Sequence, residues 1–402
     1  MRGYTACASV IVGLWNAVTL AQSNIDPDRA FSWGENIGWL NWRCDPENGV
    51  VVGAEFLSGY IWAENVGWID LGDGNGPYGN NDDTDFGVNI LPDGDLDGFA
   101  WGENIGWVNF GTDAVAPLQA RLDFARGRFR GFAWGENIGW INLNDAEHFV
   151  AVIPEAPLAD PSGFDKCRFV SFVVTTAQES AIRVTPTSLH HVSPPYTGGA
   201  SIPFTLFEGQ SQYVGPPAQY VESASSGTPF YASQLQCTPH YQNWSTIGLL
   251  HVTGEAIVPS STYNVENLAA SCSGNEPSCT AVSTPLAILT TRWGDVETPY
   301  NPPVSDPQPD TSDISALVNK FKSALGAPIK ARSLLFGDSR GRIDIAPDLN
   351  FSHISACVDA FKGLPYPYKP GKCTGDPAKA CVGDSDCTST PNPTTGPCIL
   401  CP

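Results

Sequence analysis

The sequence predicts a mainly β protein with an N-terminal aromatic β-repeat region, a β-sandwich, a small α-helical pair and a cysteine-rich tail. Three observations lead to this prediction. A nine-residue aromatic phrase occurs four times within the first 150 residues. The next stretch, of about 130 residues, holds short β-branched segments separated by Pro and Gly. Helical periodicity appears only later, in two matching segments, residues 313–322 and 353–362. A chain of 402 residues is long enough for two to four domains.

The first 21 residues have the parts of a secretory signal peptide. A short polar start with Arg2 is followed by the apolar run 6–20 and by a small residue, Ala21. We therefore expect a secreted protein, extracellular or at the cell surface. No other stretch approaches the roughly eighteen apolar residues of a membrane span, so we expect no membrane insertion. The formal net charge of −21 disfavours nucleic acid as a partner, because the phosphate backbone would repel the chain.

Residues 22–150 are organised around the repeated phrase, which contains eight of the twelve tryptophans. Its copies are residues 31–39, 60–68, 99–107 and 132–140, and each follows the pattern aromatic-x-Trp-(Gly/Ala)-Glu-Asn-(Ile/Val)-Gly-Trp. Aromatic and β-branched residues favour strands, and Asn-x-Gly favours a tight turn. Each repeat is predicted to form about three short strands, and neighbouring repeats are predicted to stack or to share one sheet.

Two interpretations remain open for the first tryptophan of each copy, namely Trp33, Trp62, Trp101 and Trp134. In the first, the tryptophans fill the core and each Asn amide holds its own turn. In the second, exposed indole rings stack on sugar rings while Glu and Asn bind sugar hydroxyls. The first is favoured, because a whole phrase repeated with its glycines indicates self-structure.

The phrase resembles the W-S-E-N-I-G-W-I repeats of secreted and surface proteins of environmental bacteria. The resemblance covers about residues 27–145 and implies no activity. A polar insertion rich in Gly, Asn and Asp, residues 72–83, lengthens the spacing before the third copy. It is predicted to be a solvated surface loop, with a calcium site as the alternative.

Residues 151–164 are predicted to be a Pro-rich linker, and residues 165–292 a β-sandwich domain. Strand-like segments occupy residues 168–175, 181–185, 247–253, 263–268 and 286–291. Pro and Gly clusters separate these segments, and no stretch of helical length lies between them. Short strands with turns between them are typical of a sandwich.

The sandwich region shows no catalytic or zinc-binding motif. Its histidines lack the spacing of a zinc site; they are His190, His191, His240 and His251. A glycosidase pair requires two carboxyl groups within about 5–10 Å, and only the fold decides whether two of Glu208, Glu222 and Glu255 meet this condition. No nucleophile motif occurs, so no catalytic residue is predicted.

Residues 293–370 are predicted to contain two similar amphipathic helices. Segments 313–322 and 353–362 match each other forty residues apart. Each has apolar residues at i, i+3, i+4 and i+7, which places them on one helical face. A loop rich in acidic residues precedes each helix, beginning at Gly-Asp in both copies.

This duplicated loop and helix resembles the dockerin module. The resemblance implies two calcium ions held in shortened EF-hand loops, and docking onto a cohesin-like protein partner. The residues that would hold calcium are Asp295, Asp306, Asp310, Asp313, Asp338, Asp344, Asp348 and Asn350. Two departures weaken the match: Asp295 and Asp313 are eighteen residues apart rather than eleven, and His353 stands where an acid is expected. A calcium-free helical pair is the alternative.

Eleven cysteines follow the predicted leader, and in an exported chain they indicate disulfides. Cys272 and Cys279 enclose a tight loop and are the predicted pair. An odd count requires at least one thiol to be free or to pair between molecules. The tail, residues 371–402, is predicted to be a small stapled segment. The C-x2-C spacing of Cys398 and Cys401 is a weak zinc signal.

The sequence thus favours a secreted, non-catalytic modular surface or assembly protein that docks through its dockerin-like module. The alternative, from a different class, is an extracellular polysaccharide-degrading enzyme whose repeats bind glycan. The lack of an acid pair or nucleophile motif favours the first. Calcium is the expected cofactor, and a cohesin-like protein and a glycan are the expected partners.

Overall fold

The computed structural model of the chain describes residues 22–45, 47–112, 118–161, 167–176, 178–189, 207–221, 230–302, 305, 308–339, 341–345, 347–381, 387–388 and 396–401. The predicted leader, residues 1–21, lies outside them. The fold is mainly β, as predicted, and it divides into two compact units. The first unit comprises residues 1–154, 177–179 and 268–282, and the second comprises residues 155–176, 180–267 and 283–402. No helix in the described ranges is long and apolar enough to cross a membrane.

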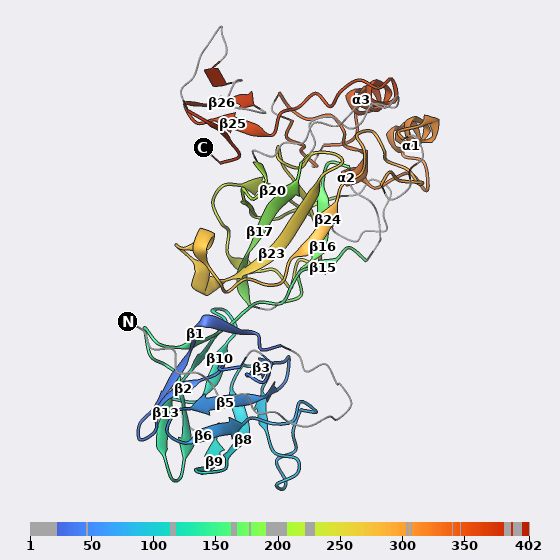
Figure 1. The fold of residues 1–402 in the computed structure, drawn as a ribbon. Coiled ribbons are helices and arrows are strands. Elements are labelled where there is room, and N and C mark those ends of the chain that lie inside the picture. The colour runs from blue at the N-terminus through green and yellow to red at the C-terminus, as the bar shows by residue number, and fades with distance from the viewer. Residues whose placement is uncertain are drawn as a thin grey trace. The chain divides into compact units, whose positions relative to one another are not determined.

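The repeats of the first unit form a closed β-barrel of eight antiparallel strands (Figure 1). Each copy of the phrase supplies one hairpin. The hairpins are β1 (Ile25–Gly34) with β2 (Gly38–Asn41), β5 (Tyr60–Ala63) with β6 (Gly67–Asp70), β8 (Leu96–Gly102) with β9 (Gly106–Asn109), and β12 (Phe132–Gly135) with β13 (Gly139–Asn142). Successive hairpins pair through β2–β5, β6–β8 and β9–β12, and β13 returns to β1, which closes the ring. The repeats therefore share one sheet.

Shorter strands extend the sheet of this barrel, namely β7 (Val88–Ile90), β10 (Arg121–Asp123), β11 (Arg128–Arg130) and β14 (Val150–Val152). β3 (Val51–Val52) and β4 (Leu57–Ser58) pair in a separate two-stranded sheet. β7 pairs with β8, and β14 pairs with β1 and β11. A glycine precedes the aromatic strand in three repeats because the backbones approach closely there. At Gly131, where φ is +77°, an added Cβ would lie 1.9 Å from the carbonyl oxygen of Gln119.

The barrel interior is filled mainly by small residues on the first strand of each hairpin and by larger apolar residues on the second, with Ile61 as a large residue on the first strand of the second hairpin. In the first hairpin, Gly34 lies under Ile37 of the turn, and an added Cβ would meet the Ile37 Cγ1 at 2.4 Å. The third and fourth hairpins repeat this Gly–Ile contact. The second hairpin has Ala63 and Val66 at the same positions. The extra methyl on Ala63 is thus accompanied by a shorter side chain at Val66, which conserves volume.

This exchange predicts a compensating pair of substitutions in the fourth hairpin. Gly135→Ala alone should destabilise the barrel by about 1–3 kcal/mol, because its Cβ would lie 2.5 Å from the Ile138 Cγ1. Ile138→Val alone should lower stability by about 0.5–1.5 kcal/mol. The double variant reproduces the second hairpin and should be more stable than Gly135→Ala. Denaturant unfolding of the four proteins gives the coupling energy, and additive effects would contradict the contact.

The second unit contains a β-sandwich whose two sheets share β20 (Figure 1). β15 (Leu158–Ala159), β16 (Val170–Val173), β22 (Leu249–Thr253) and β19 (Ala218–Tyr220) lie with β20 (Phe230–Gln236) in one sheet. The other sheet contains β18 (Gln212–Val214), β17 (Glu179–Ser188), β23 (Thr262–Ala269) and β24 (Leu286–Leu289), and β21 (Gln242–Asn243) pairs with β17. All five predicted strand segments are strands. Strands β15, β18, β19, β20 and β21 were not predicted from the sequence.

The helical pair packs on the sandwich within one hydrophobic core. Helices α1 (Thr311–Phe321) and α3 (Phe351–Phe361) are the two predicted helices, and α2 (Lys330–Ser333) lies between them in the chain. The core runs from Phe169 and Trp244 of the sandwich region to Leu317 of α1 and Ile354 of α3. Most of the apolar helical face predicted from the sequence therefore packs on the sandwich, whereas Phe321, the last residue of that face in α1, is 53% exposed.

The tail is stapled by disulfides, as predicted. Its strands are β25 (Gly371–Cys373), β26 (Asp376–Cys381) and β27 (Cys398–Ile399). The bonds are Cys373–Cys387 and Cys381–Cys398 within the tail and Cys237–Cys401 between the tail and the sandwich. The predicted Cys272–Cys279 bond is confirmed; it joins the last residue of one short 3-10 helix, Ala270–Cys272, to the residue that follows another, Glu276–Ser278. Cys398 and Cys401 are both oxidised, which removes the zinc interpretation of their spacing.

Candidate functional site

The tryptophans of the repeats lie on the outer face of the barrel. Trp33, Trp101 and Trp134 are each 39–42% exposed, and Trp62 is partly buried. The favoured prediction that these tryptophans fill the core is wrong. Side chains alternate along each short strand, and the inward positions hold Gly, Ala, Ser, Ile, Leu and Val. An eight-stranded barrel has an interior only wide enough for such side chains, so the indoles face outward.

Each hairpin presents a cluster of three aromatic rings, here called an aromatic triad. Trp33 lies opposite Trp39 across the hairpin, with ring centroids 4.9 Å apart and an edge-to-face geometry. Phe31 packs against Trp39 at 6.4 Å. The other triads have the same arrangement and comprise Tyr60, Trp62 and Trp68; Phe99, Trp101 and Trp107; and Phe132, Trp134 and Trp140. The second tryptophans were not among the predicted site residues, although pairing Gly34 with Gly38 in a hairpin places them across from the first.

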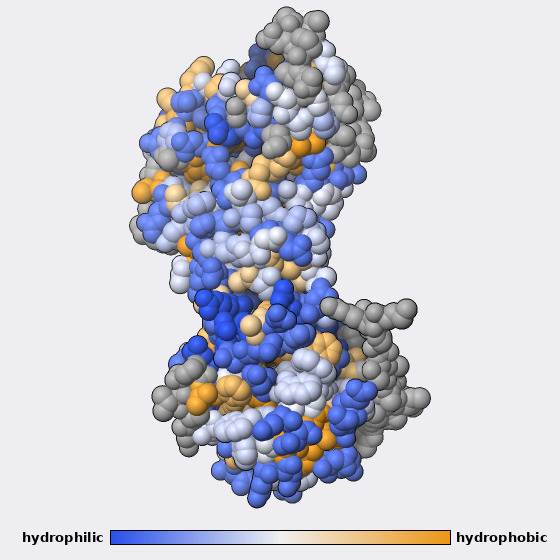
Figure 2. Space-filling view, turned by 90° about the vertical axis from the view of Figure 1, so that its left-hand side faces the viewer, coloured by the Kyte–Doolittle hydropathy of each residue, from blue (hydrophilic) through white to orange (hydrophobic). Residues whose placement is uncertain are grey.

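Polar side chains separate the triads around the barrel. The first tryptophan of each hairpin is paired with the last strand residue of a neighbouring hairpin, so that Trp33 lies opposite Asn142 and Trp101 opposite Asp70. Asn41 and Asn109 stand in the same position beside Trp62 and Trp134. Paired residues across a sheet point to the same face. Each first indole is therefore flanked by a second indole and by an amide or carboxylate. In the lower body of Figure 2, which carries the barrel, apolar and near-neutral residues interrupt the hydrophilic surface.

The four asparagines of the phrase form a ring of hydrogen bonds around one end of the barrel. The Asn36 amide donates to the carbonyl of Ile138 at 3.1 Å, and Asn65 donates to Ile37 at 2.9 Å. Asn104 and Asn137 continue the ring to Val66 and Ile105. Each amide thus holds the turn of the neighbouring repeat, so the prediction that it bonds its own turn is wrong. The glycine after each turn has positive φ, which aims the strand back into the barrel.

The acidic residues of the first C-terminal loop bind backbone amides. Asp313 is buried, and its carboxylate accepts N–H groups from Val296 at 2.7 Å, Glu297 at 2.9 Å and Asp310 at 2.8 Å. Burial raises the pKa of Asp313 to about 6, against the lowering by these three amides. Asp310 is the N-cap of α1 and accepts from the Ser312 N–H. Asp295 is buried and accepts from the Asn301 N–H at 2.7 Å. Asp306 lies outside the described residues.

The acidic residues of the second loop are spread over different partners. Asp338 pairs with Arg342 at 3.0 Å, and Asp348 pairs with Lys330 at 3.1 Å. Asn350 is the N-cap of α3, and Asp344 is exposed. In the described part of the chain, the only three potential metal ligands that converge are Cys373, Cys381 and Cys387, which are all in disulfides. Calcium binding by the two loops stays a prediction.

The position of His353 matches that of Asp313 in the first copy. Asp313 accepts from the backbone N–H seventeen residues before it, and His353 Nδ1 accepts from the Phe336 N–H, also seventeen residues before, at 3.0 Å. In both copies, therefore, the first turn of the helix carries a hydrogen-bond acceptor, and this acceptor binds a backbone N–H of the preceding loop. Burial lowers the pKa of His353 from 6.5 to about 4.

This lowered pKa predicts a pH dependence. Between about pH 6.5 and pH 4 the unfolded state binds a proton at this position and the folded state does not, so stability falls as the pH falls. His353→Gln keeps an acceptor without a titrating ring. The stability difference between the unaltered protein and this variant should shrink by about 2–3 kcal/mol on going from pH 7 to pH 4. Denaturant unfolding at several pH values measures it. The shift of Asp313 is common to both proteins and cancels, and a pH-independent difference would contradict the prediction.

The remaining candidates of the sandwich region do not form one site. His251 is buried and contacts the Tyr220 hydroxyl at 2.5 Å, and His240 bonds Gln242 at 3.1 Å. Glu208 is exposed, and Glu255 lines a cavity described below. His190, His191 and Glu222 lie outside the described residues. The comparisons with known proteins add no assignment: no family model, no curated protein and no solved structure matches the chain.

Proposed function

We propose that this protein is a secreted, non-catalytic binding protein whose N-terminal barrel binds glycans through its aromatic triads. The carrying observation is that the phrase places a pair of tryptophans on the outer face of the barrel in every hairpin, with most of them about two-fifths exposed. The barrel core does not require these indole rings, because smaller side chains fill the barrel interior. Large apolar side chains gathered at a surface mark an interaction site.

The chemistry of the face fits a sugar. Indole rings are flat and apolar and accept the C–H face of a pyranose, while Asn and Asp beside them bind hydroxyls. Asn41, Asn109 and Asn142 lie beside the first tryptophan of a hairpin, and Asp70 takes this place for Trp101. Four similar faces on one barrel would bind a polysaccharide chain or surface with an avidity higher than that of one face.

Affinity electrophoresis of the full chain through gels containing neutral polysaccharides tests this proposal. Retardation by at least one polymer is expected. Trp101→Ala should weaken it, and Trp101→Ala combined with Trp134→Ala should weaken it further. Phe336→Ala, which removes an exposed aromatic ring of the other unit, is the matched control and should have no effect. Unchanged retardation in the tryptophan variants would refute the proposal.

A second function, docking of a partner protein, is favoured by exposed apolar residues on the helical pair. Phe321 and Phe351 of the helices, and Leu325 and Leu364 beyond their ends, are each more than half exposed. Such side chains suit a protein interface. Calorimetric titration with a cohesin domain in calcium and in chelator tests the docking. Binding that Phe321→Ser weakens would support it, and no heat at micromolar concentrations would contradict it.

A further inference from the structure

The second unit contains a cavity of about 520 Å³ that the proposed function does not use. Strands β18 to β20 and the end of β22 form one side of it, the loop around Arg342 forms another, and Lys372 of β25 also lines it. This volume lies in the range of small-molecule sites. Three predicted modules, the sandwich, the helical pair and the tail, each contribute to its lining.

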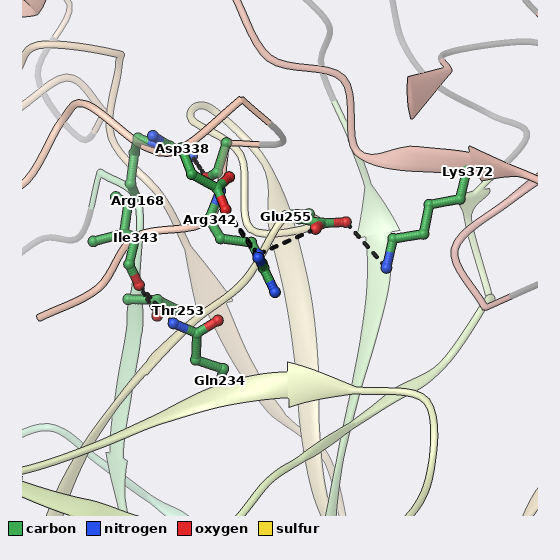
Figure 3. Close-up of polar contacts among 9 residues, drawn as sticks. Arg168, Gln234, Thr253, Glu255, Asp338, Arg342, Ile343 and Lys372 are labelled. Carbon is green, nitrogen blue, oxygen red and sulfur yellow. Dashed lines mark hydrogen bonds and ion pairs between the residues drawn. The ribbon is translucent and has the colours of Figure 1, made fainter. Parts of the chain in front are cut away.

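A buried carboxylate lines this cavity between two cations. The Glu255 side chain is only 9% exposed; its Oε2 lies 3.1 Å from Lys372 Nζ and its Oε1 lies 3.7 Å from Arg342 Nε (Figure 3). Arg342 also pairs with Asp338 at 3.0 Å. Both cations are thus already matched by carboxylates. Glu255 Oε1 is buried and accepts no hydrogen bond from any described residue.

The glutamine side chains that line the cavity donate their N–H groups to other partners. Their amide oxygens therefore remain as acceptors. The Gln234 Nε2 donates to the carbonyl of Ile343 at 2.8 Å, and the Gln236 Nε2 donates to the carbonyl of Thr238 at 2.6 Å. Since a carbonyl cannot donate, these bonds fix which end of each amide is the oxygen. The Gln212 Nε2 donates to the Cys401 Sγ at 3.7 Å, and the Gln212 Oε1 is buried with no partner within the described ranges. A buried acceptor that stays unpaired is unfavourable.

We propose that this cavity binds a small, neutral, hydroxyl-rich molecule of the size of a mono- or disaccharide. Its acceptors are the Glu255 carboxylate and the amide oxygens of Gln234 and Gln236, so the ligand must supply several donors. An anionic ligand is disfavoured because Arg342 and Lys372 are already paired and Asp344 adds a further negative charge to the lining. Pro216, Leu235 and Ile345 provide apolar surface for the C–H groups of a sugar ring.

Saturation-transfer NMR and calorimetry on the full chain test this proposal, with glucose, galactose, mannose, xylose, maltose and lactose as neutral probes and glucuronate as the acidic probe. At least one neutral sugar should bind. Glu255→Gln keeps the shape of the side chain and removes its charge. The affinity for that sugar should fall about tenfold, as expected for the loss of one charge-assisted hydrogen bond. Glucuronate should bind better to this variant, because Lys372 loses its carboxylate partner.

Controls separate this site from the barrel and from misfolding. Glu208→Gln, at an exposed glutamate of the same unit, should leave the sugar affinity unchanged, and the loss caused by Glu255→Gln should be the same in a Trp101→Ala background. Should Glu255→Gln fail to fold, Gln236→Met removes another acceptor and should weaken binding several-fold. The proposal is overturned if no neutral sugar binds at millimolar concentration, if Glu255→Gln and Gln236→Met leave the affinity unchanged, or if the unaltered protein prefers glucuronate.

Discussion

Trp42→Ala should destabilise the barrel by about 3–5 kcal/mol, the largest effect expected for any tryptophan of the repeats. Trp42 follows the first phrase, is fully buried, and donates from its indole N–H to the Ser32 hydroxyl at 2.8 Å. Its ring packs against Phe129 with centroids 4.9 Å apart and against Phe110 at 6.4 Å. Truncation would leave a cavity among these rings and remove the donor that bonds the Ser32 hydroxyl.

Trp134→Ala is the matched comparison and should lower stability by only about 1 kcal/mol, because its ring lies on the outer face and loses mainly the edge contact with Trp140. Denaturant unfolding followed by tryptophan fluorescence reports mainly on the barrel, which holds nine of the twelve tryptophans. Equal losses in the two variants would mean that the outer tryptophans carry the fold, and the glycan-binding proposal would lose its basis.

The repeat architecture was predictable because each copy of the phrase contains the residues that define a hairpin turn. Gly34 and Gly38 bracket a Glu-Asn-Ile turn, and hairpin pairing follows from this spacing. The side of the sheet that each residue faces was not predictable from hydrophobicity. Trp is apolar, yet closing four hairpins into a narrow barrel leaves room inside only for residues such as Ala63 and Ile69. Closure is a property of all four repeats together, and no single repeat encodes it.

The C-terminal acids show a second limit of pattern reasoning. An acid in the first turn of a helix satisfies a calcium motif and a capping box equally well. Asp310 and Asp313 form the capping box of α1.

The cavity around Glu255 could not be predicted from the sequence for a different reason. Its residues are far apart in the chain, and only the Cys237–Cys401 bond and the packing of the tail bring Lys372 beside Glu255.

Arg168→Ala should destabilise the second unit by about 3–5 kcal/mol, because Arg168 joins the sandwich to the C-terminal module through a buried cation. It is 2% exposed, and its guanidinium donates to the carbonyls of Leu335, at 2.9 Å, and Gly341. The same group lies over the rings of Tyr366 and Tyr368, 5.1 and 4.7 Å from their centroids. Truncation would leave two carbonyls without this donor and remove both ring contacts.

Substitution of Arg168 by lysine separates the contribution of the positive charge from that of the planar guanidinium shape. Arg168→Lys keeps a cation but lacks the planar fork that reaches both carbonyls, so it should recover less than half of the lost stability. Lys322→Ala, at an exposed cation of the same unit, should change stability by less than about 0.5 kcal/mol. Thermal unfolding and limited proteolysis of the full chain measure these effects. Arg168→Ala should expose the segment around Leu335 to cleavage before the sandwich strands. Protection of that segment in the variant would show that the apolar core alone holds the module in place.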